Sequence, residues 1–164
     1  MRNTDRPRAV LALFALLACA CGGSPAAPVQ EDPVAAGDAA LSLPLEEEVT
    51  YSADGVELRG FLARPSGAGD ARPSVLVVHE WWGHNDYARR RARELADLGY
   101  VALAVDMYGE GKAASHPEDA GAFMQARLKD RPTMVARFDA GLALLRAQPD
   151  VDGDSVAAIG YCMG

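Results

Sequence analysis

The sequence predicts an α/β fold, in which helices cover the faces of a largely parallel sheet. Short, nearly continuous apolar runs, typical of strands that are buried on both faces, occupy residues 74–79, 100–105 and 155–160. Segments with helical spacing of apolar residues separate these runs. Two β-rich segments precede them and are joined by an Asp-Gly pair, which is a strong hairpin signal. The expected order is therefore a hairpin followed by β-α-β-α-α-β, with right-handed crossovers.

The hairpin opens the folded part of the chain. Its strands are expected at residues 48–53 and 56–63, on either side of Asp54 and Gly55. Asp and Gly tolerate the positive φ angles that a two-residue hairpin turn needs. A loop rich in Pro and Gly at residues 64–69 then leads to the first buried strand.

The helix after the first buried strand has signals at both ends. We expect it at residues 87–98, because Asn85 or Asp86 can cap its first turn and Gly99 can end it. The second buried strand, which ends at Val105, follows directly.

Two helices are expected between the second and the third buried strand. Ser115 and Glu118 have the spacing of a capping box for a helix that ends near Lys129. Asp130 can cap a second helix over residues 131–147. Apolar residues at helical spacing give this second helix one apolar face, formed by Met134, Phe138, Leu142 and Leu145.

The composition is that of one globular domain with an acidic surface. The chain has 164 residues, of which 49% are apolar and 24% charged, so a disordered or collagen-like chain is excluded. Its 23 acidic and 16 basic side chains give a net charge of −7. An acidic surface repels phosphate backbones, so we expect no nucleic-acid partner. Three cysteines are too few for a disulfide scaffold.

The N-terminus has the pattern of an export signal. Arginines at positions 2, 6 and 8 precede an apolar run of ten residues, 9–18, which is too short to span a bilayer that needs about 20. This pattern describes a secretory signal at residues 1–21. The segment that ends at Cys19 resembles a bacterial lipobox, in which the cysteine is lipidated, and Cys21 is the alternative. We therefore expect an exported bacterial lipoprotein, periplasmic or at the cell surface, with membrane contact only through its lipid anchor.

A tether and a folded domain are expected after the signal. Residues 22–46 are rich in Ala, Pro, Gly and acidic residues, and they have neither helical nor strand periodicity. Residues 47–164 hold the predicted strands and helices and form the expected α/β domain.

The strongest chemical motif lies directly after the last apolar run. Residues 160–164 read Gly-Tyr-Cys-Met-Gly, which is the thiol form of the G-x-S-x-G nucleophile elbow. A sharp turn would lift Cys162 above the sheet, and the flanking glycines would let that turn close. The backbone N–H of Met163 would then point toward a developing oxyanion. A buried, inert cysteine in a Gly-rich turn is the alternative.

A second motif follows the first buried strand, where residues 79–84 read His-Glu-Trp-Trp-Gly-His. In α/β-hydrolases the loop at this place donates the second oxyanion N–H. A zinc site is not expected, because H-E-x-x-H sites need two histidines four residues apart on a helix. Here the histidines are five residues apart, and Gly83 lies between them. The two tryptophans can also pack in a core or pocket.

Together the motifs HEWWG, ALAVDMYGEGK and GYCMG resemble the dienelactone hydrolase family of α/β-hydrolases, from Glu47 onward. The resemblance implies an α/β-hydrolase fold and hydrolysis of an ester or lactone through an acyl-cysteine intermediate. It implies that Cys162 is the nucleophile and that Glu80 contacts the resting thiol and takes part in its activation. It also implies an oxyanion hole formed by the backbone N–H groups of Trp81 and Met163. No cofactor or metal is expected.

The sequence departs from the family pattern after the second buried strand. The family has an arginine that binds the substrate carboxylate where this chain has Glu110. An acidic group there would repel an anionic substrate, so dienelactone itself is not the expected substrate. We expect Glu110 and Lys112 to form a solvated pair on the loop.

A second departure concerns the catalytic base. In this fold the nucleophile precedes the acid and the histidine, but every histidine of this chain precedes Cys162, namely His79, His84 and His116. We therefore expect the front part of a longer hydrolase, truncated after the nucleophile elbow. We expect this fragment to be inactive, because a thiol without its base is weakly activated.

Two other functions stay open beside a hydrolase of small-molecule esters or lactones. One is a non-catalytic surface lipoprotein that uses a degenerate hydrolase fold as a binding module. The other is a redox thiol protein, but that function would need a resolving partner for Cys162, and the predicted domain has no second cysteine.

Overall fold

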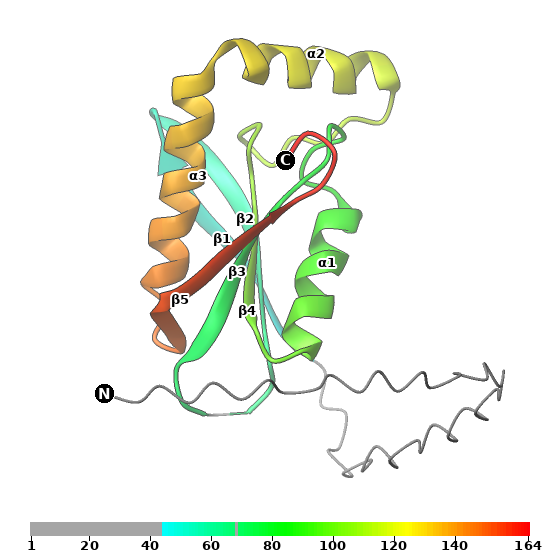
Figure 1. Cartoon of the computed structure of the whole chain (residues 1–164). Helices are drawn as coiled ribbons and strands as arrows, with labels where there is room; N and C mark the ends of the chain where they lie inside the picture. Colours follow the sequence, from blue (N-terminus) through cyan, green and yellow to red (C-terminus); the bar gives the residue numbers. More distant parts are fainter. Residues whose placement is uncertain (1–43, 68) are drawn as a thin grey trace, which may run out of the picture. The chain divides into compact units, whose positions relative to one another are not determined.

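The computed structural model of the chain describes residues 44–67 and 69–164. These residues form, in order along the chain (Figure 1), β1 (Leu45–Ala53), β2 (Val56–Arg64), β3 (Arg72–Val78), α1 (Asp86–Asp97), β4 (Val101–Val105), α2 (Pro117–Lys129), α3 (Arg131–Arg146) and β5 (Val151–Gly160). The predicted α/β class and the predicted order of elements are confirmed.

The start of the sheet differs slightly from the expected domain boundary at residue 47. Leu45 and Glu46 already belong to β1, because both pair with the end of β2. The predicted signal at residues 1–21, with Cys19 and Cys21, lies outside the described residues, as does most of the predicted tether. In the described part of the chain, no helix is both long and apolar enough to cross a bilayer.

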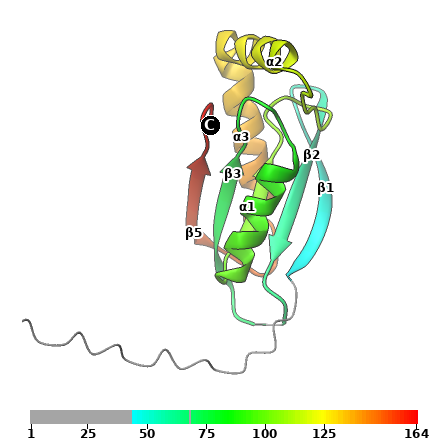
Figure 2. The ribbon, with the colours of Figure 1, turned by 90° about the vertical axis from the view of Figure 1, so that its right-hand side faces the viewer.

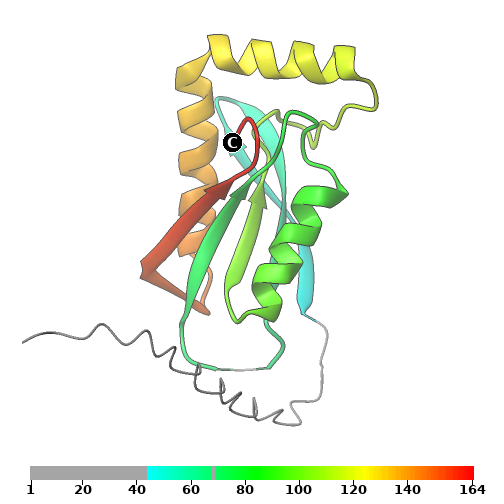
Figure 3. The same cartoon turned by 45° about the vertical axis from the view of Figure 1, so that its right-hand side comes forward.

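The strands form one sheet in the order β1-β2-β4-β3-β5. β1 and β2 are the predicted antiparallel hairpin. Its turn residues Asp54 and Gly55 have φ angles of 51° and 74°, both positive as a type I′ turn requires. β3 pairs in parallel with β4 and with β5. The carboxyl ends of these three strands therefore meet at one end of the sheet (Figure 3).

Helices cover both faces of the sheet (Figure 2). On one face, the buried alanines of α1 pack against Val77 and Ala104. On the other face, α3 packs against the alternate residues Leu76 and Leu103, since successive side chains of a strand point to opposite faces. The predicted apolar face of α3 is confirmed, because its residues all belong to this second cluster: Met134, Phe138, Leu142 and Leu145.

Side-chain caps begin two of the helices as predicted. The Asn85 side chain accepts hydrogen bonds from the N–H groups of Tyr87 and Ala88 at the start of α1. The Asp130 side chain accepts one from the N–H of Thr133 at the start of α3. Both bonds satisfy backbone donors that a helix leaves without an internal partner.

The predicted capping box of α2 is wrong. α2 begins at Pro117, and the residue before it, His116, makes no side-chain cap bond. Proline has a fixed φ and lacks an N–H, so it favours the first helical position. Ser115 therefore lies outside the helix that it was expected to cap.

β5 differs most from its prediction. A short buried strand is expected at residues 155–160, but β5 starts at Val151 and is largely exposed. Ile159 keeps 38% of its surface accessible. In the described sheet β5 has a strand neighbour, β3, on one edge only. A strand is buried on both faces only where other elements cover both faces. The apolar composition of β5 therefore predicts more burial than the strand has.

Candidate active site

The turn after β5 holds Cys162 at the end of the sheet. Cys162 is exposed and its φ is 57°, a left-handed conformation that costs free energy in a residue other than glycine. Glycine is needed before it, because a Cβ on Gly160 would lie 2.2 Å from the carbonyl carbon of Gly164. The N–H of Tyr161 donates to the Val78 carbonyl at 3.3 Å and ties the turn to β3. The chain thus makes the sharp turn that a nucleophile elbow requires.

The loop after β3 is a tight turn that also depends on glycine. The N–H of Gly83 donates to the Glu80 carbonyl at 3.1 Å. Gly83 has a φ of 90°, and a Cβ there would lie 2.3 Å from the Lys112 carbonyl oxygen. The half-buried indoles of Trp81 and Trp82 lie on this turn, with ring centroids 5.0 Å apart.

His79 connects the loops that follow β3 and β4. Its ring is fully buried. Nδ1 lies 2.6 Å from the carbonyl oxygen of Glu80, and Nε2 lies 3.2 Å from the N–H nitrogen of Met107. Burial lowers the pKa of His79 to about 4, so its ring is neutral at neutral pH.

The carboxylate of Asp106 organises the loop after β4. It accepts hydrogen bonds from the N–H groups of Tyr108, Gly109 and Gly111 at 3.0, 2.7 and 2.7 Å. A fourth bond comes from the N–H of Arg59 in β2 at 3.2 Å. Asp106 is fully buried, so these four charge-assisted bonds hold the loop against the sheet.

Tyr108 contacts both residues that are predicted to supply oxyanion donors. Its hydroxyl donates to the Trp81 carbonyl oxygen at 2.9 Å and lies 3.3 Å from Sδ of Met163. Its ring packs edge-on against His79, with ring centroids 4.7 Å apart. Burial raises the pKa of Tyr108 to about 12, and the charge of the Cys162 thiolate adds to the rise. The hydroxyl therefore stays protonated at neutral pH.

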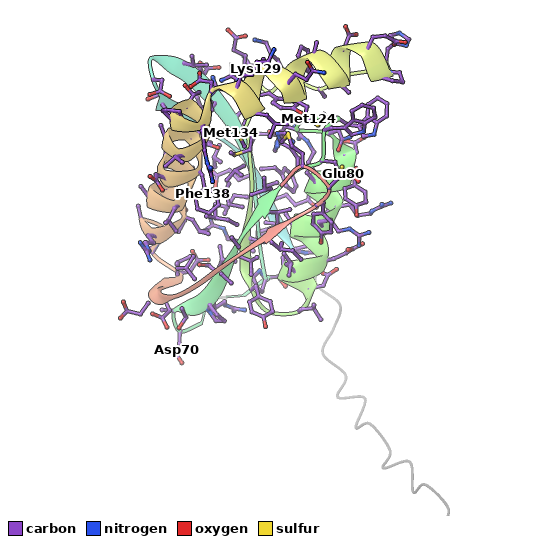
Figure 4. The ribbon with its side chains drawn as sticks, turned by 45° about the horizontal axis from the view of Figure 1, so that its top comes forward. Asp70, Glu80, Met124, Lys129, Met134 and Phe138 are labelled. Atoms are coloured by element: carbon purple, nitrogen blue, oxygen red, sulfur yellow. The ribbon has the colours of Figure 1, made fainter. Side chains whose placement is uncertain are left out.

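The predicted site residues lie at the same end of the sheet. Cys162 and Met163 belong to the turn after β5, while Glu80 and Trp81 belong to the loop after β3 (Figure 3). Figure 4 shows Glu80 beside the C-terminal turn and Asp70 at the opposite end. Glu80 is half-buried, and within the described residues its carboxylate makes no hydrogen bond with the Cys162 thiol. The roles of these residues stay predictions.

The other two histidines, His84 and His116, lie in different environments. His84 is buried, and burial lowers its pKa, while His116 is exposed before α2. In the part of the chain that the structure describes, neither ring forms a hydrogen bond with Cys162. Across residues 44–67 and 69–164, no three His, Cys, Asp or Glu side chains are grouped to bind a metal ion.

The loop after β4 carries the predicted pair of charges. Lys112 and Glu110 form an ion pair at 2.6 Å, and both side chains are largely exposed. The hydrogen bond with Lys112 lowers the pKa of Glu110. The predicted solvated loop pair is confirmed.

An apolar cleft borders the turn on the side of α3. Its volume is about 480 Å³, and its lining includes Met134, Phe138 and Met163. Figure 4 labels Met134 and Phe138, two of the residues that α3 contributes to this lining. The turn that carries Cys162 therefore has an apolar surface beside it.

Comparison with known proteins identifies the family. A sequence profile of the "Dienelactone hydrolase family" matches residues 58–164. The chain belongs to the dienelactone hydrolase family. The resemblance that the motifs predict is confirmed.

Individual relatives match most of the chain. A protein of Aquifex aeolicus strain VF5, named "Putative carboxymethylenebutenolidase", is 36% identical over 120 residues, which are 71% of this chain and 50% of that protein. The carboxymethylenebutenolidase of Pseudomonas putida is 29% identical over 119 residues, 69% of this chain and 49% of that protein. A solved structure of a dienelactone hydrolase-like promiscuous phosphotriesterase from metagenomic libraries matches with a TM-score of 0.71 and 38% identity, over 75% of this chain and 51% of that chain. This chain of the dienelactone hydrolase family thus spans about half the length of the curated relatives that it matches.

Sequence reasoning missed three residues of this site. The roles of His79, Asp106 and Tyr108 come from contacts between loops that are far apart in the sequence. One local signal points to Asp106, because an acidic residue at a strand end, followed closely by Gly109 and Gly111, is typical of a side chain that caps a loop.

Proposed function

We propose that the hydrolase to which this domain belongs cleaves an uncharged carboxylic ester or lactone through an acyl-cysteine intermediate on Cys162. The thiolate attacks the substrate carbonyl carbon and forms an S–C bond, while the carbonyl oxygen becomes an oxyanion. The N–H groups of Trp81 and Met163 donate to that oxyanion. The C–O bond to the alcohol then breaks, and the leaving alkoxide takes a proton from solvent. Water hydrolyses the thioester, releases the acid and restores the thiol.

The observation that carries the proposal is the left-handed turn at Cys162. A residue other than glycine keeps a φ of 57° only where the surrounding structure holds the backbone in that conformation. Here it presents an exposed thiol, and the Tyr108 hydroxyl joins this turn, at Met163, to the loop of Trp81. Membership of the dienelactone hydrolase family supports the ester or lactone chemistry. We assign Glu80, half-buried beside the turn, a part in activating the thiol, as the resemblance implies.

The loops after β3 and β4 bear on the substrate class. Lys112 is paired with Glu110 at 2.6 Å, so it is not a free cation for a substrate carboxylate. The indoles of Trp81 and Trp82 offer apolar, half-buried surface on the loop after β3. These features favour an uncharged ester over an anionic one.

A single-turnover acylation tests the proposal. The chain is mixed with p-nitrophenyl acetate at about pH 9, above the ordinary thiol pKa of about 8.5, and the release of p-nitrophenolate is followed. We expect one equivalent without steady turnover in the wild-type chain. Cys162→Ala keeps Cys19 and Cys21, so it measures the background release from those thiols, and we expect the Cys162-dependent equivalent to be absent from it. An identical release from both chains would contradict the proposal and favour the non-catalytic binding module.

We propose further that the chain is exported and lipidated at Cys19 or Cys21. The lipobox-like segment before Cys19 supports this proposal. Expression in a bacterium with labelled palmitate should label the wild-type chain and send it to the membrane fraction. Cys19→Ala and Cys21→Ala tell the two positions apart, and an unlabelled wild-type chain would refute the anchor.

A further inference from the structure

The peptide between Glu80 and Trp81 is held at its carbonyl end. The Glu80 carbonyl oxygen is 3.1 Å from the N–H nitrogen of Gly83 and 2.6 Å from Nδ1 of His79. A trans peptide is planar, and its C=O and N–H point in opposite directions. Whatever fixes this carbonyl therefore also fixes the direction of the Trp81 N–H, the group that is predicted to bind the oxyanion.

The hydrogen bonds of His79 show where its ring proton lies. The backbone N–H of Met107 can only donate, so Nε2 of His79 is the unprotonated nitrogen. The ring is neutral at neutral pH because burial lowers its pKa to about 4, and a neutral imidazole carries one N–H. That proton is on Nδ1, which donates to the Glu80 carbonyl.

We propose that His79 is a positioning residue, whose Nδ1–H bond to the Glu80 carbonyl aims the Trp81 N–H at the oxyanion formed on Cys162. The inference rests on the proposed function, since it assigns a duty to the same site. A hydrogen bond at the carbonyl end of a peptide also polarises it and strengthens its N–H as a donor. The Asp106-bound loop fixes Met107, and Met107 in turn fixes the ring of His79.

Two variants of His79 separate its two hydrogen bonds. In His79→Asn, the side-chain amide N–H takes the place of Nδ1–H, so the donor to Glu80 is kept and the acceptor for Met107 is lost. In His79→Gln, the amide oxygen reaches the place of Nε2, so the acceptor is kept and the donor is lost. Each variant loses one buried hydrogen bond, so a merely structural role would weaken both alike. Thermal unfolding of both variants measures that shared loss.

The readout compares two reactions of the same thiol. Acylation of Cys162 by p-nitrophenyl acetate builds an oxyanion, whereas alkylation by iodoacetamide displaces iodide from a saturated carbon and builds none. Peptide mass spectrometry measures both rates on Cys162. We expect His79→Gln to slow acylation on the order of tenfold to a hundredfold, with alkylation unchanged, and His79→Asn to keep acylation within about threefold. Equal slowing in the two variants, or a slower His79→Asn, would overturn the proposal.

A second measurement is independent of ester chemistry. Nitrogen NMR of the wild-type chain with isotope-labelled histidine should show that His79 is protonated on Nδ1 and unprotonated on Nε2 at neutral pH. The Trp81 amide resonance should move in His79→Gln and stay in place in His79→Asn. A ring protonated on Nε2, or an equal shift in both variants, overturns the proposal. If both expected NMR results are found but the wild-type thiol does not react with the ester, the proposed function is contradicted. The positioning of the Trp81 peptide by His79 is then still supported.

Discussion

The two sides of the site differ in how firmly they are held. On the side of β3 and β4, His79 and Asp106 are fully buried, and each bonds groups on two different segments. On the side of β5, Ile159 is 38% exposed and Cys162 is exposed. Contacts within the described residues therefore fix the loops of the expected oxyanion hole. In the described sheet, the turn that holds Cys162 follows a strand with a neighbour on one side only.

We expect the largest effect from Asp106, whose carboxylate accepts four backbone hydrogen bonds on the side of β3 and β4. Asp106→Ala removes the acceptor of four backbone N–H groups, so we expect unfolding free energy to fall by about 4 kcal/mol. Urea denaturation measures the loss. Asp106→Asn keeps one acceptor oxygen and should lose less. An unchanged midpoint in Asp106→Ala would show that the loop does not depend on this carboxylate.

A matched pair of apolar truncations compares the two sides directly. Leu103 of β4 is fully buried, and we expect Leu103→Ala to cost about 3 kcal/mol of unfolding free energy. Ile159 of β5 is 38% exposed, and we expect Ile159→Ala to cost less than about 1 kcal/mol, because less apolar surface returns to water. Denaturant midpoints of the two variants give the comparison. Equal losses would mean that β5 is as well packed as β4.

The pH dependence of stability tests the burial of His79. Its pKa is about 4 in the folded chain, against about 6.5 when unfolded. Between these values the unfolded state binds more protons, so the stabilising contribution is complete above pH 6.5 and is lost as pH falls toward 4. We expect about 2 kcal/mol less stability from this group at pH 5 than at pH 7. The control is His79→Asn, which keeps His84 and Asp106 and should have a shallower slope over this range.

The smallest expected effect lies where the loop after β3 enters α1. Asn85→Ala removes the cap that accepts the N–H bonds of Tyr87 and Ala88, and we expect a loss of about 1 kcal/mol. Asn85→Asp keeps the acceptor oxygen and serves as the control. Thermal unfolding measures both, and a wild-type melting temperature in Asn85→Ala would argue that the cap contributes nothing.

Features with local signals could be predicted from the sequence. The hairpin follows from Asp54 and Gly55, the start of α1 from Asn85, and the sharp turn from the glycines on either side of Cys162. The exposure of β5 could not be predicted, because an apolar run does not say how many neighbours its strand has. The role of His79 depends on a bond to Met107, 28 residues further along the chain, and no local pattern encodes such a contact.

Locating the acyl group after a single turnover tests the role of Cys162 most directly. The wild-type chain is mixed with p-nitrophenyl acetate, quenched in acid within the burst, digested and mapped by mass spectrometry. We predict one acetyl group on the peptide that contains Cys162. Acetyl groups found only on lysines such as Lys112 and Lys129, with the Cys162 peptide unmodified, would contradict it.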